Sequence, residues 1–156
     1  MPGRGVHFAV DRPTLAAILL AADPPHRLAL LDRLEAAWDD LWLCETDKAW
    51  PAIDRALATD AERFPDSPLG AHELDVGPQV RASLLTASEV KALAAAVAPL
   101  GPPEFAALYR RIDPAAHDQP LSGADLEYTW AWFLDLQDLL RRAADADRAV
   151  IFTVGE

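Results

Sequence analysis

Two short stretches of the chain combine side chains that can bind a ligand or take part in a reaction. The first holds Asp47, Lys48 and Trp50, and the second holds His72 and Asp75. Carboxylates, histidine and lysine are the usual acids and bases of hydrolytic sites, and tryptophan offers a flat apolar surface to a ligand. If the fold brings the two stretches together, they form the site of a small hydrolase or ligand-binding enzyme.

Apart from these stretches, the sequence lacks the spacings that mark common catalytic and metal sites. The four histidines include no HxxxH or HxH pair, and no glycine loop of a phosphate-binding type or GxSxG elbow is present. Cys44 is the only cysteine, so a thiolate zinc cluster and an internal disulfide are excluded, and we interpret Cys44 as a buried apolar residue. We assign no catalytic residue, no metal and no cofactor.

The five tryptophans are the unusual part of the composition. Trp130 and Trp132 fall on one predicted helix and point about 200° apart around its axis. Both are buried only if that helix is enclosed on two sides; otherwise one of them lines a pocket or an interface. Tryptophan is enriched where proteins bind one another, so an exposed one would indicate such a surface.

The elements that position these residues follow from periodicity and capping residues. Apolar residues at steps of three and four, with Thr86–Glu89 and Ser122 as helix caps, predict about six helices. Alternating or β-branched runs predict four short strands. The expected helices cover residues 13–22, 26–43, 47–59, about 86–98, 103–111 and 122–145, and the expected strands cover Gly5–Val10, Leu69–Leu74, Gln79–Leu85 and Ala149–Val154. The third helix has an alternative start at Pro51, which leaves Thr46–Trp50 as a turn.

These elements predict the α+β class, with the helices packed on a small mixed sheet that includes the N- and C-terminal strands. The helix over residues 122–145 is apolar around most of its circumference and should be the central core helix. A hydrophobic content of 51% and a length of 156 residues fit one core, and no linker divides the chain, so we expect a single domain over residues 1–156.

A formal net charge of −11 constrains the possible partners. Nucleic acid and anionic membranes are disfavoured because no basic stripe offsets the charge, whereas a basic protein surface is compatible with it. The single cysteine favours a reducing compartment, and we expect a cytoplasmic protein. Leu15–Ala22 resembles a short signal peptide, but Asp11 and Arg12 directly before it argue against that interpretation.

Three stretches resemble the YfbM-like family of small bacterial proteins, a domain of unknown function. They are Thr46–Trp50 with its following helix, Leu69-Gly70 leading to Leu85–Val90, and the ending that runs from Tyr128 through Phe133 and Leu140 to Ala143-Ala144 before the last strand. The resemblance implies an α+β fold with a helical layer against a small sheet. It implies no reaction.

The sequence thus leads to two hypotheses and a third possibility. The first is a non-catalytic protein-binding module, an adaptor or neutralising partner, which uses an acidic surface bearing tryptophan. The alternative is the small hydrolase or ligand-binding enzyme with a site near Trp50 and His72. The third is a homo-oligomer whose extra tryptophans fill a subunit interface.

Overall fold

The computed structural model describes residues 3–117 and 119–155. The elements follow one another as β1 (Gly5–Val10), α1 (Arg12–Leu19), α2 (Pro24–Ala37), β2 (Leu43–Asp47), α3 (Trp50–Ala58), β3 (His72–Leu74), β4 (Val80–Leu85), α4 (Ala87–Val97), α5 (Pro102–Tyr109), a short 3-10 turn (Pro114–Ala116), α6 (Gly123–Asp145) and β5 (Ala149–Gly155). Six helices and five strands confirm the α+β class. None of the helices in this described part is long and apolar enough to cross a membrane.

The five strands form one sheet in the order β2-β1-β5-β4-β3. The N- and C-terminal strands lie side by side in it, with Val6 opposite Thr153. All of the described pairings are antiparallel, whereas the sequence predicted a mixed sheet. The reason is in the connections: no two neighbouring strands are joined by a single crossover helix, which is the usual link between parallel neighbours.

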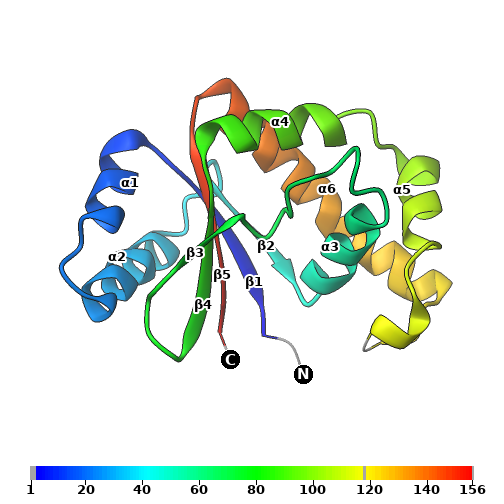
Figure 1. The fold of residues 1–156 in the computed structure, drawn as a ribbon, viewed down its shortest axis with the longest axis horizontal. Coiled ribbons are helices and arrows are strands. Elements are labelled where there is room, and N and C mark those ends of the chain that lie inside the picture. The colour runs from blue at the N-terminus through cyan, green and yellow to red at the C-terminus, as the bar shows by residue number, and fades with distance from the viewer. Residues whose placement is uncertain (1–2, 118, 156) are drawn as a thin grey trace.

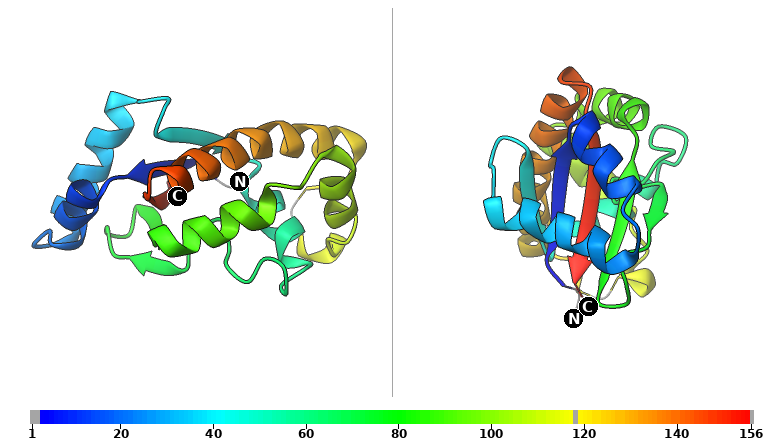
Figure 2. Two further views of the ribbon diagram at one scale, coloured as in Figure 1. Left: turned by 90° about the horizontal axis from the view of Figure 1, so that it is seen from above. Right: turned by 90° about the vertical axis from the view of Figure 1, so that its left-hand side faces the viewer.

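Helices cover both faces of the sheet (Figures 1 and 2). α1 and α2 lie on one face, and α3, α4, α5 and α6 lie on the other. Successive residues of a strand point to opposite faces, so Phe8 belongs to the core under α1 and α2 and Ala9 to the core under the other four helices. The same alternation along β5 separates Ile151 from Val150. The architecture is therefore three-layered, with one more helical layer than the family resemblance implied.

Two helix starts agree with their sequence signals. Thr86 Oγ1 accepts from the Glu89 N–H at 3.3 Å while a Glu89 carboxylate oxygen accepts from the Thr86 N–H, which completes the predicted capping box of α4. Ser122 accepts from the Asp125 N–H at 3.1 Å and begins α6. α6 is the core helix that was expected, with five fully buried apolar side chains: Phe133, Leu136, Leu139, Leu140 and Ala143.

The helix predicted over residues 26–43 is wrong in its last six residues. α2 ends at Ala37, and Trp38 takes the left-handed conformation with φ 43°. Asp39 accepts from the Leu41 N–H at 3.1 Å, a side-chain turn that reverses the chain into β2. Trp38 therefore lies in the turn after α2, and Trp42 lies just before β2. Pairing of β2 with β1 overrides the helical periodicity of this stretch, which tertiary contacts commonly do.

The start of α3 decides between the two alternatives for the Thr46–Trp50 segment. α3 begins at Trp50 with Ala49 as its cap and Pro51 in its first turn, so Asp47 is not the helix cap. Thr46 and Asp47 belong to β2 instead of forming only a turn. The strand expected over Leu69–Leu74 is shorter than predicted, because only the last three of those residues pair with β4.

Candidate functional site

The five site residues predicted from the sequence lie at two separate places in the fold. Asp47, Lys48 and Trp50 are at the end of β2 and the start of α3, whereas His72 and Asp75 are on β3 and just after it. β2 and β3 are the two opposite edge strands, separated by three strands, so they are about 19 Å apart at the usual spacing. The structure therefore does not bring the two stretches into one site.

Trp50 is fixed by contacts within the fold. Its indole Nε1 donates to the Gly3 carbonyl at 2.8 Å, and its ring packs against Phe152 with centroids 5.6 Å apart. A Cβ placed on Gly5 would lie 2.8 Å from the Trp50 ring, so this part of the sheet needs glycine to let the indole approach. Trp50 thus serves packing at the sheet end.

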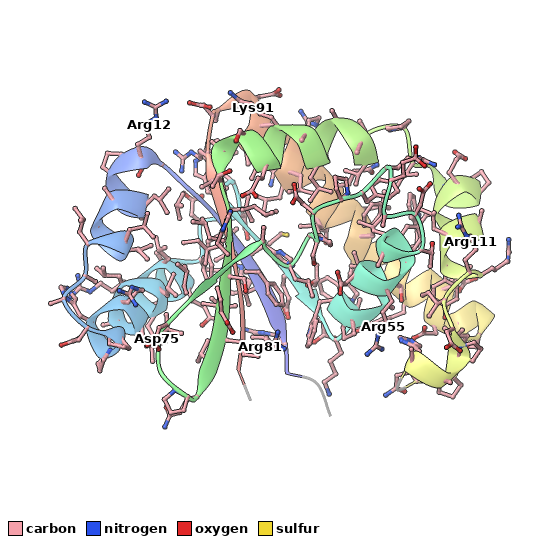
Figure 3. All side chains as sticks on the ribbon, in the orientation of Figure 1. Arg12, Arg55, Asp75, Arg81, Lys91 and Arg111 are labelled. Carbon is pink, nitrogen blue, oxygen red and sulfur yellow. The ribbon has the colours of Figure 1, made fainter. Side chains whose placement is uncertain are left out.

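His72 and Asp75 fasten the β3–β4 hairpin. His72 Nε2 lies 2.9 Å from a Glu89 carboxylate oxygen at the start of α4. The Asp75 carboxylate accepts from the Gly77 N–H at 3.1 Å, and its backbone carbonyl accepts from the Arg27 guanidinium of α2. Figure 3 places Asp75 beside this hairpin, on the other side of the sheet from Arg55 of α3. These contacts account for both residues structurally.

Asp47 lies near aromatic residues of α6. Its backbone has φ 43°, and its carboxylate accepts from the Tyr128 hydroxyl, which in turn accepts from the Lys48 N–H at 3.2 Å. Burial and then the hydrogen bond to this carboxylate raise the pKa of Tyr128. The Tyr128 ring meets Trp132 edge to face, with centroids 6.4 Å apart. This aromatic pair leads from the predicted residues to a hollow that the sequence did not reveal.

That hollow, which we call the β2–α6 groove, runs between edge strand β2 and helix α6. It has a volume of about 360 Å³. Its lining comes from the α2–β2 turn, from β2 and from α6: Trp38, Asp40, Leu43, Cys44, Glu45, Trp132, Asp135, Asp138 and Arg142. Seen from above in Figure 2, α6 runs beside β2, in agreement with the close packing of these two elements.

The groove is acidic. Four carboxylates line it against a single basic side chain, Arg142, which pairs with Asp138. Glu45 pairs with Arg4, whose Nε lies 3.2 Å from its carboxylate. Within residues 3–117 and 119–155, no basic side chain forms an ion pair with Asp40 or Asp135. Two carboxylates are thus available to a cationic partner.

Cys44 lines the groove, but its thiol is not a nucleophile. Burial, reinforced by the negative charge of Asp135, raises the pKa of the Cys44 thiol far above neutral pH. A thiol held neutral is a poor nucleophile and a poor metal ligand. Among the described residues, no group of three or more histidine, cysteine, aspartate or glutamate side chains is arranged to hold a metal ion.

A second polar cluster lies where α3, α5 and α6 meet. Arg55 donates to His117 Nδ1 at 2.8 Å, and His117 Nε2 lies 3.5 Å from the Asp125 carboxylate, which also accepts from the Tyr109 hydroxyl. Burial and the Asp125 carboxylate raise the pKa of Tyr109, so it stays a protonated donor. Each member bonds to another element, so the cluster ties three helices together. The spacing of these four residues in the sequence did not predict this cluster.

The groove contains one residue that the sequence pointed to. Trp130 packs against Phe105 with ring centroids 5.5 Å apart, and Trp132, on the other side of α6, lines the groove; both side chains are partly buried against the same core. This is the division that their angular separation on one helix allowed. Asp135 and Asp138 lie on the exposed side of α6, and only the position of β2 makes them part of a groove.

Comparison with known proteins gives a family whose function is unknown. The chain is similar to the crystal structure of YfbM from Escherichia coli, a protein of unknown function, with 17% sequence identity, a TM-score of 0.60 and 99% of each chain covered. At this identity the likeness shows the fold alone. No curated protein matches the chain. Residues 1–153 match the family described as Domain of unknown function (DUF1877), so the YfbM-like resemblance is confirmed and the chain belongs to that family.

Proposed function

We propose that the chain is a non-catalytic protein-binding module whose β2–α6 groove engages a basic segment of another protein. The observation that carries the proposal is that this one groove combines Trp38 and Trp132 with two carboxylates, Asp40 and Asp135, that have no ion-pair partner among the described residues. Lysine and arginine side chains suit both features, because ammonium and guanidinium groups bind carboxylates and the faces of indole rings.

The chain's own Arg4 uses the same chemistry at one end of the groove. Its guanidinium lies 5.5 Å from the Trp38 ring centroid and 3.2 Å from the Glu45 carboxylate. Trp38 is 37% exposed, and the neighbouring Leu41 is 53% exposed, so apolar surface remains for a partner's aliphatic carbons. Because a cationic side chain of the chain itself binds at this end of the groove, we expect the partner to bind the rest of the groove through further cationic side chains.

The charge of the whole chain supports the same kind of partner. A net charge of −11 attracts a basic protein over distances up to the screening length and accelerates its encounter with the groove. The hydrolase alternative receives no comparable support, because Trp50 and His72 lie at opposite edges of the sheet. The groove itself contains no histidine, and its one thiol is held neutral.

Fluorescence anisotropy with a defined peptide tests the proposal. The probe is fluorescein-labelled Thr-Lys-Val-Lys-Val-Lys-Thr, and we expect it to bind the wild-type chain at low salt with a Kd on the order of 10 μM. Trp132→Ala and Asp135→Asn should each weaken binding about tenfold, because each removes one of the two features that recognise a cation.

Matched variants away from the groove provide the control. Glu73→Gln removes one exposed carboxylate at the β3 edge, and Leu20→Ala removes an apolar side chain that is 82% exposed. Both should bind the probe like the wild type. Absence of binding, or equal weakening by the groove and control variants, contradicts the proposal. So does a dimer in sedimentation that Trp132→Ala converts to monomer, since the groove would then be a subunit interface.

A further inference from the structure

The backbone of β2 presents a row of hydrogen-bonding groups to the groove. Opposite residues of an antiparallel pair alternate between those that exchange two hydrogen bonds and those that exchange none. The Ala9 N–H donates to the Trp42 carbonyl at 2.8 Å, which places Ala9 and Trp42 at a bonded position of the alternation, while the Trp42 N–H donates to the Asp39 carbonyl. By alternation His7 and Cys44 form the next bonded pair, whereas Leu43 and Glu45 direct their N–H and C=O groups away from β1.

These outward groups have no partner elsewhere in residues 3–117 and 119–155. β2 is the last strand of the sheet on its side, and no turn, cap or side-chain hydrogen bond uses the N–H or C=O of Leu43 or Glu45. Leu43, Cys44 and Glu45 all line the groove although consecutive side chains point to opposite faces. The groove therefore follows the strand edge itself.

The two walls of the groove differ in a way that fixes where a partner's side chains would point. Cys44 faces the core under α6, so a residue paired with it would point along α6 toward Trp132 and Asp135. Leu43 faces the α1 and α2 side, so residues paired with Leu43 and Glu45 would point toward Trp38. A partner strand would thus meet Trp132 and the α6 carboxylates on one face and Trp38 on the other.

We propose that the partner segment binds in extended conformation as a sixth strand paired antiparallel with β2, with a lysine or arginine opposite Cys44 that reaches Asp135. This inference rests on the proposed function and adds how the groove binds. An unpaired strand edge is a ready template for another chain, and such strand addition takes its affinity from backbone hydrogen bonds and its specificity from alternate side chains.

Charge complementarity selects this occupant over a second copy of the chain. Two copies that met edge to edge would bring Glu45 and Asp135 of one close to the same carboxylates of the other. β2 itself has the sequence Leu-Cys-Glu-Thr-Asp and carries no basic residue. A basic extended segment meets no such repulsion.

N-methylation of the peptide backbone tests the inference. The probe is again Thr-Lys-Val-Lys-Val-Lys-Thr, with its central lysine expected opposite Cys44 and its two valines opposite Leu43 and Glu45. One derivative is N-methylated at both valines and the other at the two flanking lysines. Methylation removes an N–H and keeps the side chain, so the valine derivative should bind at least tenfold more weakly, and the lysine derivative within about threefold of the parent.

Hydrogen exchange of the full-length chain gives an independent measurement. Binding of the parent peptide should slow exchange of the Leu43 and Glu45 amides at least tenfold and change that of Cys44 little, because the Cys44 amide already pairs with β1. Equal effects of the two methylated derivatives, or a larger effect of the lysine derivative, overturn the inference and leave the proposed function standing. Failure of the parent peptide to bind overturns the proposed function itself.

Discussion

At one edge of the sheet β2 pairs only with β1, and at the other edge β3 pairs only with β4, yet the two edges differ in length and surroundings. β3 has three residues, and both its ends are fastened: His72 contacts Glu89 of α4, and the carbonyl of Asp75 binds Arg27 of α2. β2 has five residues, and its outward edge opens into a groove between a tryptophan-bearing turn and α6.

The difference indicates how one edge of a sheet can be protected from pairing with other chains while the opposite edge can accept a partner strand. A short strand with charged side chains resists pairing with other chains, and the exposed Glu73 in the middle of β3 adds to that protection. β2 has no lysine or proline and no strand on its outer side, but the carboxylates around it restrict what can pair with it to basic segments. We infer that the β2 edge is kept for binding and that the β3 edge is closed.

The largest expected effect concerns His7, which lies directly behind β2. His7 pairs with Cys44, is fully buried, and has Nε2 2.9 Å from Thr46 Oγ1. Burial lowers its pKa to about 3. A histidine in the unfolded chain takes up a proton below about pH 6.5, whereas His7 in the folded chain stays neutral. The free energy of unfolding therefore falls as the pH drops below that value, by roughly 2 kcal/mol between about pH 6.5 and about pH 5.

His7→Leu should remove this loss, which urea unfolding at the two pH values measures. The readout is the difference between the two free energies of unfolding, so a constant cost of the substitution cancels. His72→Gln at the other edge should keep the wild-type loss, because His7 is intact in it. If His7→Leu loses as much stability on acidification as the wild type, the buried neutral histidine is not its cause.

A smaller effect distinguishes how the two edges are held. Arg27 donates to the carbonyls of Asp75 and Ile18, the latter at 3.1 Å, and so holds the end of β3 on α2 and α1. Arg27→Met should speed hydrogen exchange of the β3 amides about tenfold, or about 1.4 kcal/mol, by opening this edge locally.

Arg142→Met is the matched control at the other edge. Arg142 donates to the Leu41 carbonyl at 3.0 Å just before β2, so its loss should leave exchange in β3 unchanged. Equal acceleration of β3 in the two variants would mean that global unfolding, and not release of one edge, controls the exchange.

Local signals explain the parts of the fold that the sequence predicted. The capping box at Thr86 and the Ser122 cap act within one helical turn, so α4 and α6 could be placed from neighbouring residues alone. The alternation in β1 and the apolar run of β5 likewise reflect burial on the faces of a sheet. In each case a residue's own neighbours determine its conformation.

β2 and the groove could not be predicted in this way. Leu43–Asp47 is a strand because β1 lies beside it, and the preceding stretch has a helical period that ends only at the left-handed Trp38. The groove joins the α2–β2 turn to α6, nearly a hundred residues away in the chain, so Asp135 looked like an ordinary solvated carboxylate. Only the angular position of Trp132 pointed toward a surface of this kind.

The smallest expected effect tests the contact that closes the β3 edge. Burial acts to raise the pKa of Glu89, but hydrogen bonds from Thr86 and His72 outweigh it, so the pKa lies below its ordinary value. A carboxylate with a lowered folded pKa stabilises the fold above its unfolded pKa of about 4.3, and that contribution is lost as the pH falls through the lower folded value. Glu89→Gln should therefore lose about 0.5 kcal/mol less than the wild type between about pH 5.5 and about pH 3.5, as measured by urea unfolding. Glu104→Gln, which changes the glutamate at the same position of α5, should keep the wild-type loss at Glu89, and equal behaviour of the two variants would show that the Glu89 carboxylate is not the source of this loss.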